Sequence, residues 1–250
     1  MTEAICYRDA YLRSVDASVT GIDQAEGVTA LILDRTVFYP GGGGQPSDTG
    51  RIVRVGADGS PEASWVVSGA KRHGDEIAHL LAAADGRLPE VGQRVVAEID
   101  WDRRHLLMRT HTALHTLCGV VWRDHRALVT GGKMEPGQGR MDFEFERMSG
   151  ELVGEIEGRV NDELAAEHEV RIRVLPRAEA FAIPDLIRTK VNLLPDEMRE
   201  VRVVEIVGLD LQADGGTHVA NTREVGRIRV TGYESKGRIN KRIRLEVVDR

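Results

Sequence analysis

Two histidine motifs, far apart in the sequence, contain the residue types of one divided metal site. The first, His111-Thr-Ala-Leu-His115, places its histidines four residues apart. Residues with that spacing lie on the same face of a helix, so both imidazoles can reach one ion. The second motif, Asp214-Gly-Gly-Thr-His218, adds an imidazole and a carboxylate. We therefore predict one metal ion bound by His111, His115, His218 and Asp214.

Zinc is the metal that these side chains favour. Zinc commonly takes three or four such ligands, and a site with an exchangeable position can act on a substrate, which makes hydrolysis the leading reaction class. Residue 112 is threonine, so the first motif departs from the H-E-x-x-H helix of metalloproteases, in which the glutamate acts as general base. Peptide hydrolysis by that mechanism therefore loses support.

Each motif also has a purely structural interpretation. A lone histidine would be a polar residue on a partly exposed helix, but a pair beside Leu107, Leu114 and Leu117 favours metal coordination, because unpaired buried imidazoles are costly. Cys118 shares the helix face of the pair and could approach a metal, although a small buried cysteine is the simpler interpretation. For residues 214–218, the structural alternative is a tight turn allowed by two glycines.

A third motif is the glycine cluster Gly41 to Gly44, followed by Gln45. It is not a P-loop, because no Gly-Lys-Ser/Thr follows it. Two interpretations are equally consistent with its chemistry. One is a flexible surface turn, and the other is a loop that exposes backbone N–H groups and the Gln45 amide to the end of a nucleotide.

The elements that must position these motifs follow from hydrophobic periodicity. Short apolar runs broken by glycine predict a small β-barrel or sheet up to about residue 98. The period changes from 2 to 3.6 after Asp100, where Asp102 is a candidate cap for a helix that continues to Val121. A glycine-rich connection, a strand ending near Phe145 and a second helix, 151–167, follow. The predicted strands are 28–33, 50–55, 64–67, 77–81, 94–99, 170–174, 201–207, 226–233 and 238–248.

Composition excludes several classes of protein. With 250 residues, 41% hydrophobic and 30% charged, the chain can form a normal core in two domains. No apolar run approaches a membrane span, and the start of the chain lacks the apolar core of a signal peptide, so we expect a cytoplasmic protein with no membrane partner. Cys6 and Cys118 predict no disulfide. A monomer is slightly favoured, although no motif bears on the oligomeric state.

Charge gives a weaker indication about partners. The net charge of −6 argues against unselective nucleic-acid binding, because Lys and Arg supply most of that affinity. A local basic run lies between Lys236 and Arg244, with apolar residues interleaved at strand spacing. Of its two interpretations, a solvated hairpin face is favoured over a nucleic-acid-binding face.

Three segments together resemble a known family, the free-standing alanyl-tRNA editing proteins called AlaX, and the editing domain of alanyl-tRNA synthetase. They are residues 33–50, 103–117 and 209–226, and residues 129–145 match more weakly. The resemblance implies an α+β protein, with an N-terminal β-barrel over residues 1–98 and an α/β editing domain over residues 99–250. The family's histidine pair falls on His111 and His115, and its Cys-Gly-Gly-Thr-His element falls on residues 214–218.

The resemblance also implies an activity. A medium-length AlaX protein would hydrolyse the ester that joins a wrong amino acid, serine or glycine, to tRNA(Ala), with zinc as cofactor. Asp214 stands where the family usually has cysteine. Because a carboxylate is harder than a thiolate, this change shifts the preference toward other divalent ions, and Asp214 could instead orient water.

The residues expected at the site fall into three groups. The predicted metal ligands are those named above. The predicted catalytic residues are Asp214, Gly215, Gly216 and Thr217, with the N–H groups of Gly215 and Gly216 as oxyanion donors. The predicted substrate-binding residues are Thr36, Gly42, Gly43, Gly44, Gln45 and Thr130. By the resemblance, Thr36 corresponds to the family's threonine that contacts the serine hydroxyl, and Thr112, Thr130 and Thr217 compete for that role.

The sequence leaves the metal's role open between activating water, polarising the ester carbonyl and binding the substrate amino group. Two rival functions belong to other classes. One is a tRNA-binding module with a structural metal, and the other is a metal-dependent hydrolase of a small ester or amide.

Overall fold

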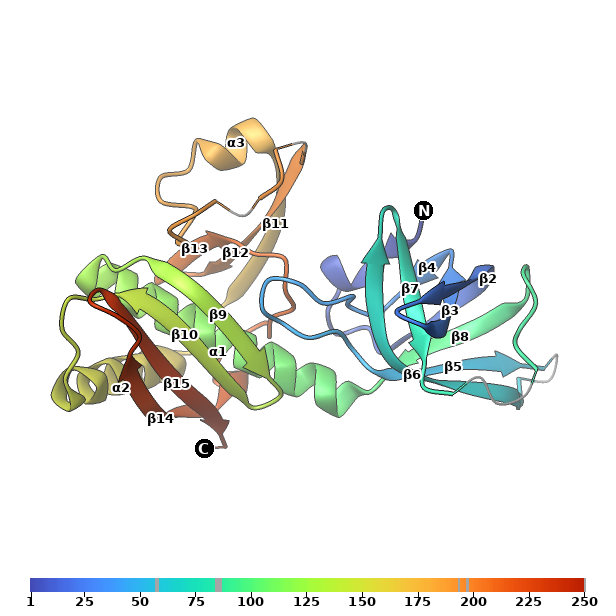
Figure 1. Cartoon of the computed structure of the whole chain (residues 1–250), viewed down its shortest axis with the longest axis horizontal. Coiled ribbons are helices and arrows are strands. Elements are labelled where there is room, and N and C mark those ends of the chain that lie inside the picture. Colours follow the sequence, from blue (N-terminus) through green and yellow to red (C-terminus); the bar gives the residue numbers. More distant parts are fainter. Residues whose placement is uncertain (57–58, 84–86, 193, 197, 250) are drawn as a thin grey trace. The chain divides into compact units, whose positions relative to one another are not determined.

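The chain folds into two compact units (Figure 1). The computed structural model describes residues 1–250 except 57–58, 84–86, 193, 197 and 250. The first unit contains Met1–Gly42 and Pro46–His105, and the second contains Gly43–Gln45 and Leu106–Arg250. The division differs from the predicted boundary after residue 98 in two ways. Trp101 packs against the core of the first unit, and the end of the glycine cluster belongs to the second.

The first unit is built on a closed antiparallel barrel with the strand order β2-β3-β7-β6-β5-β8. Alternating apolar residues enter its interior, as in the buried Ala17 and Val19 of β2, a strand that the sequence analysis missed. The barrel strands are β2 (Ser14–Ala25), β3 (Val28–Leu33), β5 (Gly50–Val55), β6 (Pro61–His73), β7 (Glu76–Leu81) and β8 (Arg94–Ile99). The unit also contains β1 (Glu3–Ala4), the 3₁₀ turn η1 (Ile5–Tyr7) and β4 (Arg35–Thr36).

Thr36 lies in this first unit, with its side chain fully buried. Its hydroxyl is 2.7 Å from Nε2 of His79 and accepts a hydrogen bond from the backbone N–H of Phe38. Because His79 Nδ1 donates to the carbonyl of Leu31 at 2.9 Å, its Nε2 must accept from Thr36. The hydroxyl is therefore already engaged on both sides, and its contact with a serine substrate stays a prediction.

A buried ion pair joins the start of the long helix to the loop before β5. Arg104 and Asp48 both have fully buried side chains, and the guanidinium Nε lies 3.0 Å from Asp48 Oδ1. Arg104 also donates to the carbonyls of Ala10 and Val37, at 2.9 and 2.6 Å. One arginine thus connects three segments of the first unit.

Helix α1 (Trp101–His125) begins in the first unit and continues through the second. Asp100 precedes it and accepts a hydrogen bond from the backbone N–H of Arg103 through its side chain. The cap is therefore Asp100, and the predicted cap Asp102 lies inside the first turn. From Thr110 to Val121 every residue of α1 is buried, so protein surrounds the helix where the histidine motif lies.

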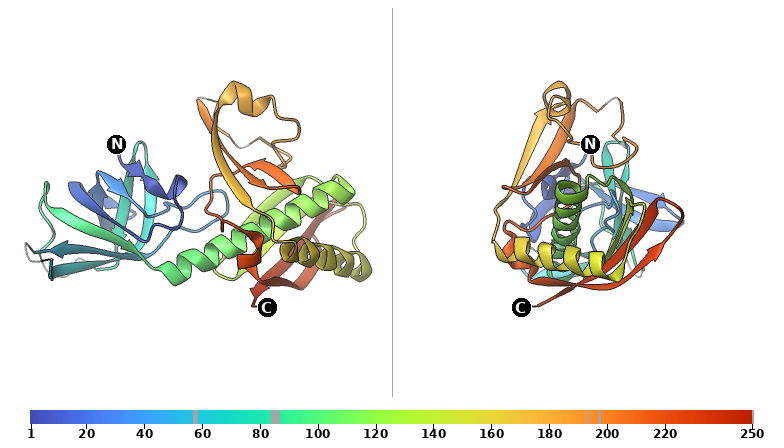
Figure 2. Two further views of the ribbon diagram at one scale, coloured as in Figure 1. Left: turned by 180° about the vertical axis from the view of Figure 1, so that it is seen from behind. Right: turned by 90° about the vertical axis from the view of Figure 1, so that its left-hand side faces the viewer.

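The second unit places α1 between two antiparallel sheets (Figure 2). Leu114 of α1 packs closely against Gly139 in the four-stranded sheet, because a Cβ at position 139 would lie 2.9 Å from the leucine Cδ1. Asp210 of the three-stranded sheet packs in the same way against Gly119 of α1. The four-stranded sheet has the order β14-β15-β10-β9, with β9 (Val129–Glu135), β10 (Gln138–Glu144), β14 (Arg227–Ser235) and β15 (Asn240–Val248).

The three-stranded sheet and two α-helices complete the second unit. Helix α2 begins after Ser149, whose hydroxyl accepts from the N–H of Leu152, and it buries Val153, Ile156, Val160 and Leu164 as the spacing predicts. The remaining elements are β11 (Val170–Pro176), β12 (Glu200–Ile206), β13 (Asp210–Ala213), α2 (Gly150–Ala165), α3 (Arg177–Phe181) and the 3₁₀ turn η2 (Thr222–Val225).

The predicted glycine-rich connection before Phe145 is instead a hairpin of β9 and β10. Gly131 and Gly132 pair in register with Asp142 and Met141. Of the glycines in this hairpin, only Gly137, in the turn, has a positive φ, 80°. A glycine with ordinary backbone angles can continue a strand, which the count of glycines alone does not reveal. The α+β fold class and the N-terminal barrel are as predicted.

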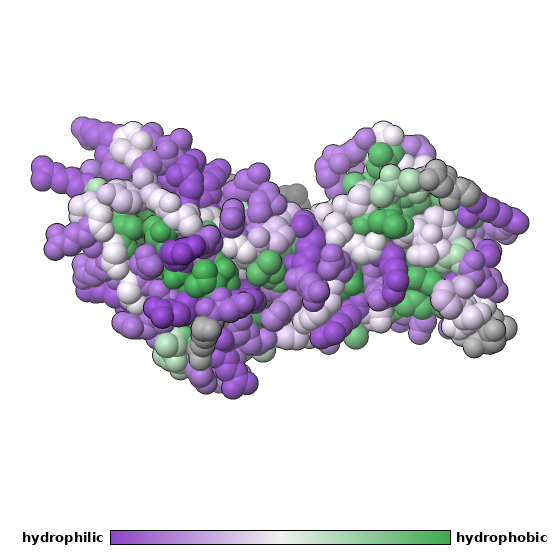
Figure 3. All heavy atoms as spheres, turned by 90° about the horizontal axis from the view of Figure 1, so that it is seen from below, coloured by the Kyte–Doolittle hydropathy of each residue, from purple (hydrophilic) through white to green (hydrophobic). Residues whose placement is uncertain are grey.

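The surface is mixed in character. On the face drawn in Figure 3, hydrophilic residues predominate and hydrophobic areas are interspersed between them. None of the helices in the described part of the chain has the length and apolar composition that crossing a membrane requires.

The ion pair of Arg104 and Asp48 should dominate the stability of the first unit. Asp48→Ala leaves the guanidinium buried without its carboxylate, so we expect the free energy of unfolding to fall by about 3–5 kcal/mol. Glu98→Ala removes the exposed ion pair with Arg51 and should cost at most about 1 kcal/mol. Urea unfolding measures both, and equal effects of the two substitutions would contradict the prediction.

His79 should make the stability depend on pH. Burial, which outweighs the hydrogen bond to Leu31, lowers the pKa of His79 to about 4. The unfolded chain therefore binds more protons between about pH 6.5 and 4, and stability falls as the pH falls through this window. We expect the difference in unfolding free energy between wild type and His79→Gln to decrease by about 3 kcal/mol from pH 7 to 4. A difference independent of pH would refute this assignment.

Candidate metal centre

The second histidine motif begins where β13 ends. The backbone of Asp214 bonds to Arg202, with the N–H donating to the Arg202 carbonyl at 3.1 Å and the Asp214 carbonyl accepting from the guanidinium at 2.8 Å. One carboxylate oxygen of Asp214, Oδ1, accepts from the N–H of Gly216 at 2.7 Å. This local turn leaves Oδ2 directed toward the histidines of the site.

Two imidazoles contact Oδ2 of Asp214. Asp214 Oδ2 lies 3.1 Å from His111 Nε2 and 3.2 Å from His218 Nε2. The two rings stack with their centroids 4.3 Å apart. Both histidines are buried, and the ligand atoms of all three residues lie within 4.8 Å of one another. The tertiary structure thus brings together three of the four predicted ligands.

The geometry of this group fits a small divalent metal. Two ligand atoms about 2.0 Å from a tetrahedral zinc ion lie about 3.3 Å apart, close to the separations from Asp214 Oδ2. Imidazole suits zinc and neighbouring transition metals, while a carboxylate extends the choice to harder ions. The group is therefore suited to a metal, but it does not determine which one.

The predicted fourth ligand, His115, does not belong to this group. Its Nε2 lies 3.2 Å from Asp210 Oδ2, and the other carboxylate oxygen of Asp210 accepts from the guanidinium of Arg188. Neither ring nitrogen has an aligned hydrogen bond within the described ranges, although both are buried. His115 thus lies beside an acid that is itself paired with Arg188, and coordination of a metal by His115 stays a prediction.

Gln45 orients the first imidazole. Its Oε1 accepts from His111 Nδ1 at 2.9 Å and from the N–H of Thr217 at 3.0 Å, while its Nε2 donates to the Thr217 hydroxyl. Because an amide oxygen only accepts, the proton of a neutral His111 must be on Nδ1, which leaves a lone pair on Nε2. Substrate contact by Gln45 stays a prediction, and the structure adds this different contact.

Thr112, the residue that replaces the metalloprotease glutamate, contacts the other imidazole. Its hydroxyl lies 3.2 Å from His218 Nδ1 and accepts from the N–H of Val219. Its side chain is fully buried. Thr112 therefore takes part in positioning His218 from α1.

Protonation in this group favours metal binding. Burial, together with the adjacent His111, lowers the pKa of His218 to about 3, despite the opposing charge of Asp214. Burial raises the pKa of Asp214, but its interactions with His111 and His218 outweigh burial, so the net pKa is well below the usual range. A neutral imidazole beside an ionised carboxylate is the form in which these residues coordinate a metal.

The glycines of the second motif have different roles. A Cβ on Gly216 would lie 2.1 Å from Cε1 of His111, so only glycine fits there, whereas a Cβ on Gly215 would meet open space. The N–H of Gly216 already donates to Asp214, and that of Thr217 to Gln45. The Gly216 N–H is bonded to Asp214 in this structure, and its role as an oxyanion donor stays a prediction. Gly215 remains a candidate.

A small cavity of about 60 Å³ opens beside the group. Gly43 and Gly44 line it, and the carbonyl of Gly44 accepts from the N–H of Met134 on β9. All four glycines from Gly41 to Gly44 have positive φ, between 57° and 133°, which explains a run of that residue type. His111, Leu114, His115, Cys118, Gly132, Lys133, Met134, Met141, Gln212 and Asp214 complete the lining.

Three residues that the sequence analysis considered for the site either lie outside the cavity or line it in another role. Gly42 belongs to the first unit, where its carbonyl accepts from the hydroxyl of Tyr39. Thr130 is exposed and donates to Asn240, and it does not line the cavity. Cys118 lines the cavity, and burial, with the charge of Asp210 next, raises the pKa of its thiol.

The sequence analysis missed Asp210, Gln212 and Arg188. Gln212 lines the cavity and donates to Asp210 Oδ2 at 2.5 Å. One available signal was the alternation of Asp210, Gln212 and Asp214, since every second residue of a strand points to the same face. Arg188 lies between predicted elements, and no local pattern indicated its role.

Comparisons with known proteins agree with this geometry. The family described as "Threonyl and Alanyl tRNA synthetase second additional domain" matches residues 201–244, which contain the second motif. The family "tRNA synthetases class II (A)" matches residues 10–103.

Full-length relatives have the same extent as this chain. The alanyl-tRNA editing protein AlaX-M of Methanosarcina barkeri is 36% identical over all of both chains. The AlaX-M of Saccharolobus solfataricus is 37% identical, over 97% of this chain and 98% of its own. An alanine–tRNA ligase of Pyrobaculum aerophilum is 35% identical over 93% of this chain, which corresponds to 25% of the ligase. The chain therefore belongs to the AlaX-M family of alanyl-tRNA editing proteins.

Proposed function

We propose that this protein removes serine or glycine from tRNA(Ala) by hydrolysing the ester bond of the mischarged aminoacyl-tRNA. The observation that carries the proposal is the convergence of His111, His218 and Asp214 beside a small cavity. These residues belong to the two motifs by which the chain resembles its relatives, whose names describe alanyl-tRNA editing.

The metal in this proposal is a divalent ion, zinc first, bound by His111, His218 and Asp214, with His115 as a further ligand. When bound, such an ion supplies Lewis acidity toward water or the ester carbonyl, or an anchor for the substrate. Gln45 contacts Nδ1 of His111 and Thr112 contacts Nδ1 of His218, so both rings are oriented with Nε2 toward Asp214. Removing contacts of this kind typically costs 10–100-fold in metal affinity.

The cavity is the proposed site for the amino acid. Its volume of about 60 Å³ suits a small side chain. Leu114, Met134 and Met141 give it apolar walls, while Gln212 contributes an amide. A site that hydrogen-bonds the serine hydroxyl rejects the analogue without it far better than an apolar pocket does, so Gln212 is a second candidate, beside Thr36, for distinguishing serine from alanine.

Editing should require the histidines of the group. We expect His111→Ala and His218→Ala each to slow deacylation of Ser-tRNA(Ala) by at least about 100-fold, because each removes a metal ligand. Ala-tRNA(Ala) should be a poor substrate of the wild type. Single-turnover assays measure the rates, and metal analysis after dialysis measures occupancy.

The exposed His73 of the first unit provides a matched control, since His73→Ala should leave rate and occupancy unchanged. If the wild type bound tRNA(Ala) without releasing serine, the binding module with a structural metal would replace the editing proposal. Metal-dependent turnover of a small ester, unaffected by tRNA, would favour the altered-substrate hydrolase.

The two adjacent glycines should respond differently to the same substitution. Gly216→Ala places a methyl group against His111, so the imidazole must move and metal affinity should fall by at least about tenfold. Gly215→Ala enters open space and should leave metal affinity within about twofold of wild type. Competition with a chromophoric chelator measures both, and an intact affinity in Gly216→Ala would exclude His111 as a ligand.

A further inference from the structure

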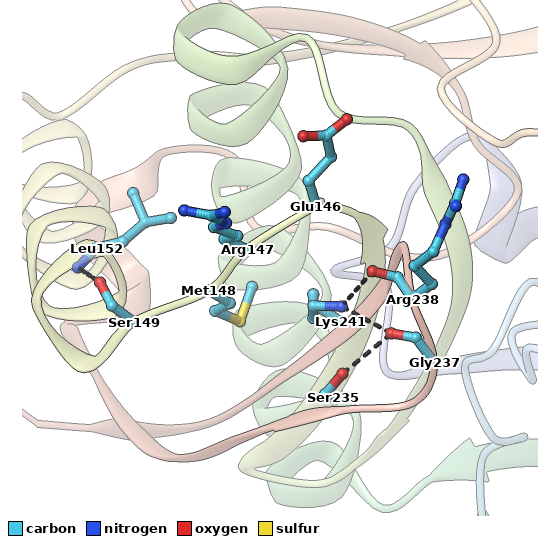
Figure 4. A pocket seen from close by; sticks show the side chains of 9 residues that line it. All are labelled: Glu146, Arg147, Met148, Ser149, Leu152, Ser235, Gly237, Arg238 and Lys241. Carbon is cyan, nitrogen blue, oxygen red and sulfur yellow. Dashed lines mark hydrogen bonds between the residues drawn. The ribbon is translucent and has the colours of Figure 1, made fainter.

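A second, larger depression lies on the same unit as the metal centre but apart from it. It has a volume of about 920 Å³ and opens between the connection that precedes α2 and the hairpin of β14 and β15 (Figure 4). Arg147, Arg238 and Lys241 contribute cationic side chains, whereas Glu146 is the one acidic residue in the lining. We call the three cations and the space between them the cationic depression.

Lys241 is a buried cation that donates to two backbone carbonyls. It is 5% exposed, and its Nζ donates to the carbonyls of Gly237 and Arg238 at 2.7 and 2.8 Å. Within the described ranges no carboxylate forms an ion pair with it. An ammonium group has three N–H donors, so one remains. Because a buried charge without a counter-charge is costly, this position is suited to an anion from outside the chain.

Arg147 and Arg238 add two guanidinium groups to the depression. Both are exposed, and neither forms an ion pair with an acid in the described part of the chain. Arg238 lies at the hairpin tip, and the carbonyl of the adjacent Ile239 accepts from the N–H of Phe145, which ties the tip to the connection that carries Arg147. Guanidinium and ammonium groups are the cationic side chains that commonly bind phosphate oxygens.

The rest of the basic run on this hairpin is neutralised within the protein. Arg242 contacts Asp142 at 2.7 Å, and Arg244 contacts Glu234 at 2.5 Å. Lys236 also lies near Glu234, at 3.6 Å. The sequence analysis favoured a solvated face for this basic run. Among the described residues, the run instead contains cations that are paired with acids and the cations of the depression, which form no ion pair.

We propose that the cationic depression binds backbone phosphate of the RNA whose 3′ end enters the metal centre, that is, the acceptor end of the tRNA. This inference rests on the proposed function. The two places are connected by one sheet, because Gly132 of β9 lines the small cavity and β15, which begins after Arg238, lies two strands away. Strand geometry separates them by roughly 15 Å, so one RNA strand leaving the cavity can reach both.

The test uses the double variant Arg147→Ala, Arg238→Ala, whose two side chains are exposed and should not affect folding. Its probes are uncharged tRNA(Ala) and an RNA minihelix of the acceptor stem, each bound at 50 to 200 mM NaCl. We expect roughly tenfold or greater loss of affinity for both RNAs at low salt, and a decrease of about 1–2 in the slope of log K against log salt. The rate of serine release at saturating protein should stay within twofold of wild type.

Arg171→Ala, Arg229→Ala is the matched control, because both arginines are exposed on the same unit but are paired with Glu169 and Glu246. It should bind like wild type. An unchanged affinity and slope in the test variant would overturn the inference, and a loss confined to full-length tRNA would overturn the assignment to the acceptor end. Neither result depends on catalysis, so a failure of serine release in the wild type would refute only the proposed function.

A titration with inorganic phosphate separates RNA from a free anion. We expect no saturable binding below about 1 mM, since one small anion gains little against solvation of exposed arginines. Tight phosphate binding with unchanged RNA affinity in the test variant would assign the depression to a free anion and overturn the RNA proposal.

Discussion

The position of one carboxylate oxygen between two buried imidazoles is the constraint on which the second unit depends. Asp214 Oδ2 lies within 3.2 Å of both His111 and His218. Burying an imidazole is costly unless its nitrogens have partners or bind a metal. Gln45 and Thr112 supply partners for the outer nitrogens, and the absence of a side chain at Gly216 lets the second motif approach the helix.

Glycine has several distinct roles in this structure. Gly41 to Gly44 adopt positive φ, and Gln45, which follows them, belongs to the second unit. Gly139, Gly119 and Gly216 instead permit close packing, against Leu114, Asp210 and His111. Glycine therefore allows an unusual backbone conformation in one segment. In the other segments it allows α1 to pack closely against its neighbours.

Charge in this protein is organised locally, so the net value is a poor guide to its partners. The acidic total coexists with a depression whose three cations form no ion pair with an acid in the described part of the chain, while nearby arginines are paired. Phosphate recognition depends on such local groups. The Arg104–Asp48 pair illustrates the opposite use, in which a fully buried cation connects segments of the first unit.

The sequence alone predicted the α+β class, the barrel, most strands within a few residues, and one metal group of His111, His115, His218 and Asp214, of which the structure brings three together. Those features depend on short-range periodicity and on residue chemistry. The tertiary structure decided the partner of His115, the orientation of His111 by Gln45, the engaged N–H of Gly216 and the burial of Lys241 against backbone carbonyls. Each of these depends on contacts between distant segments or on backbone geometry, which local patterns do not encode.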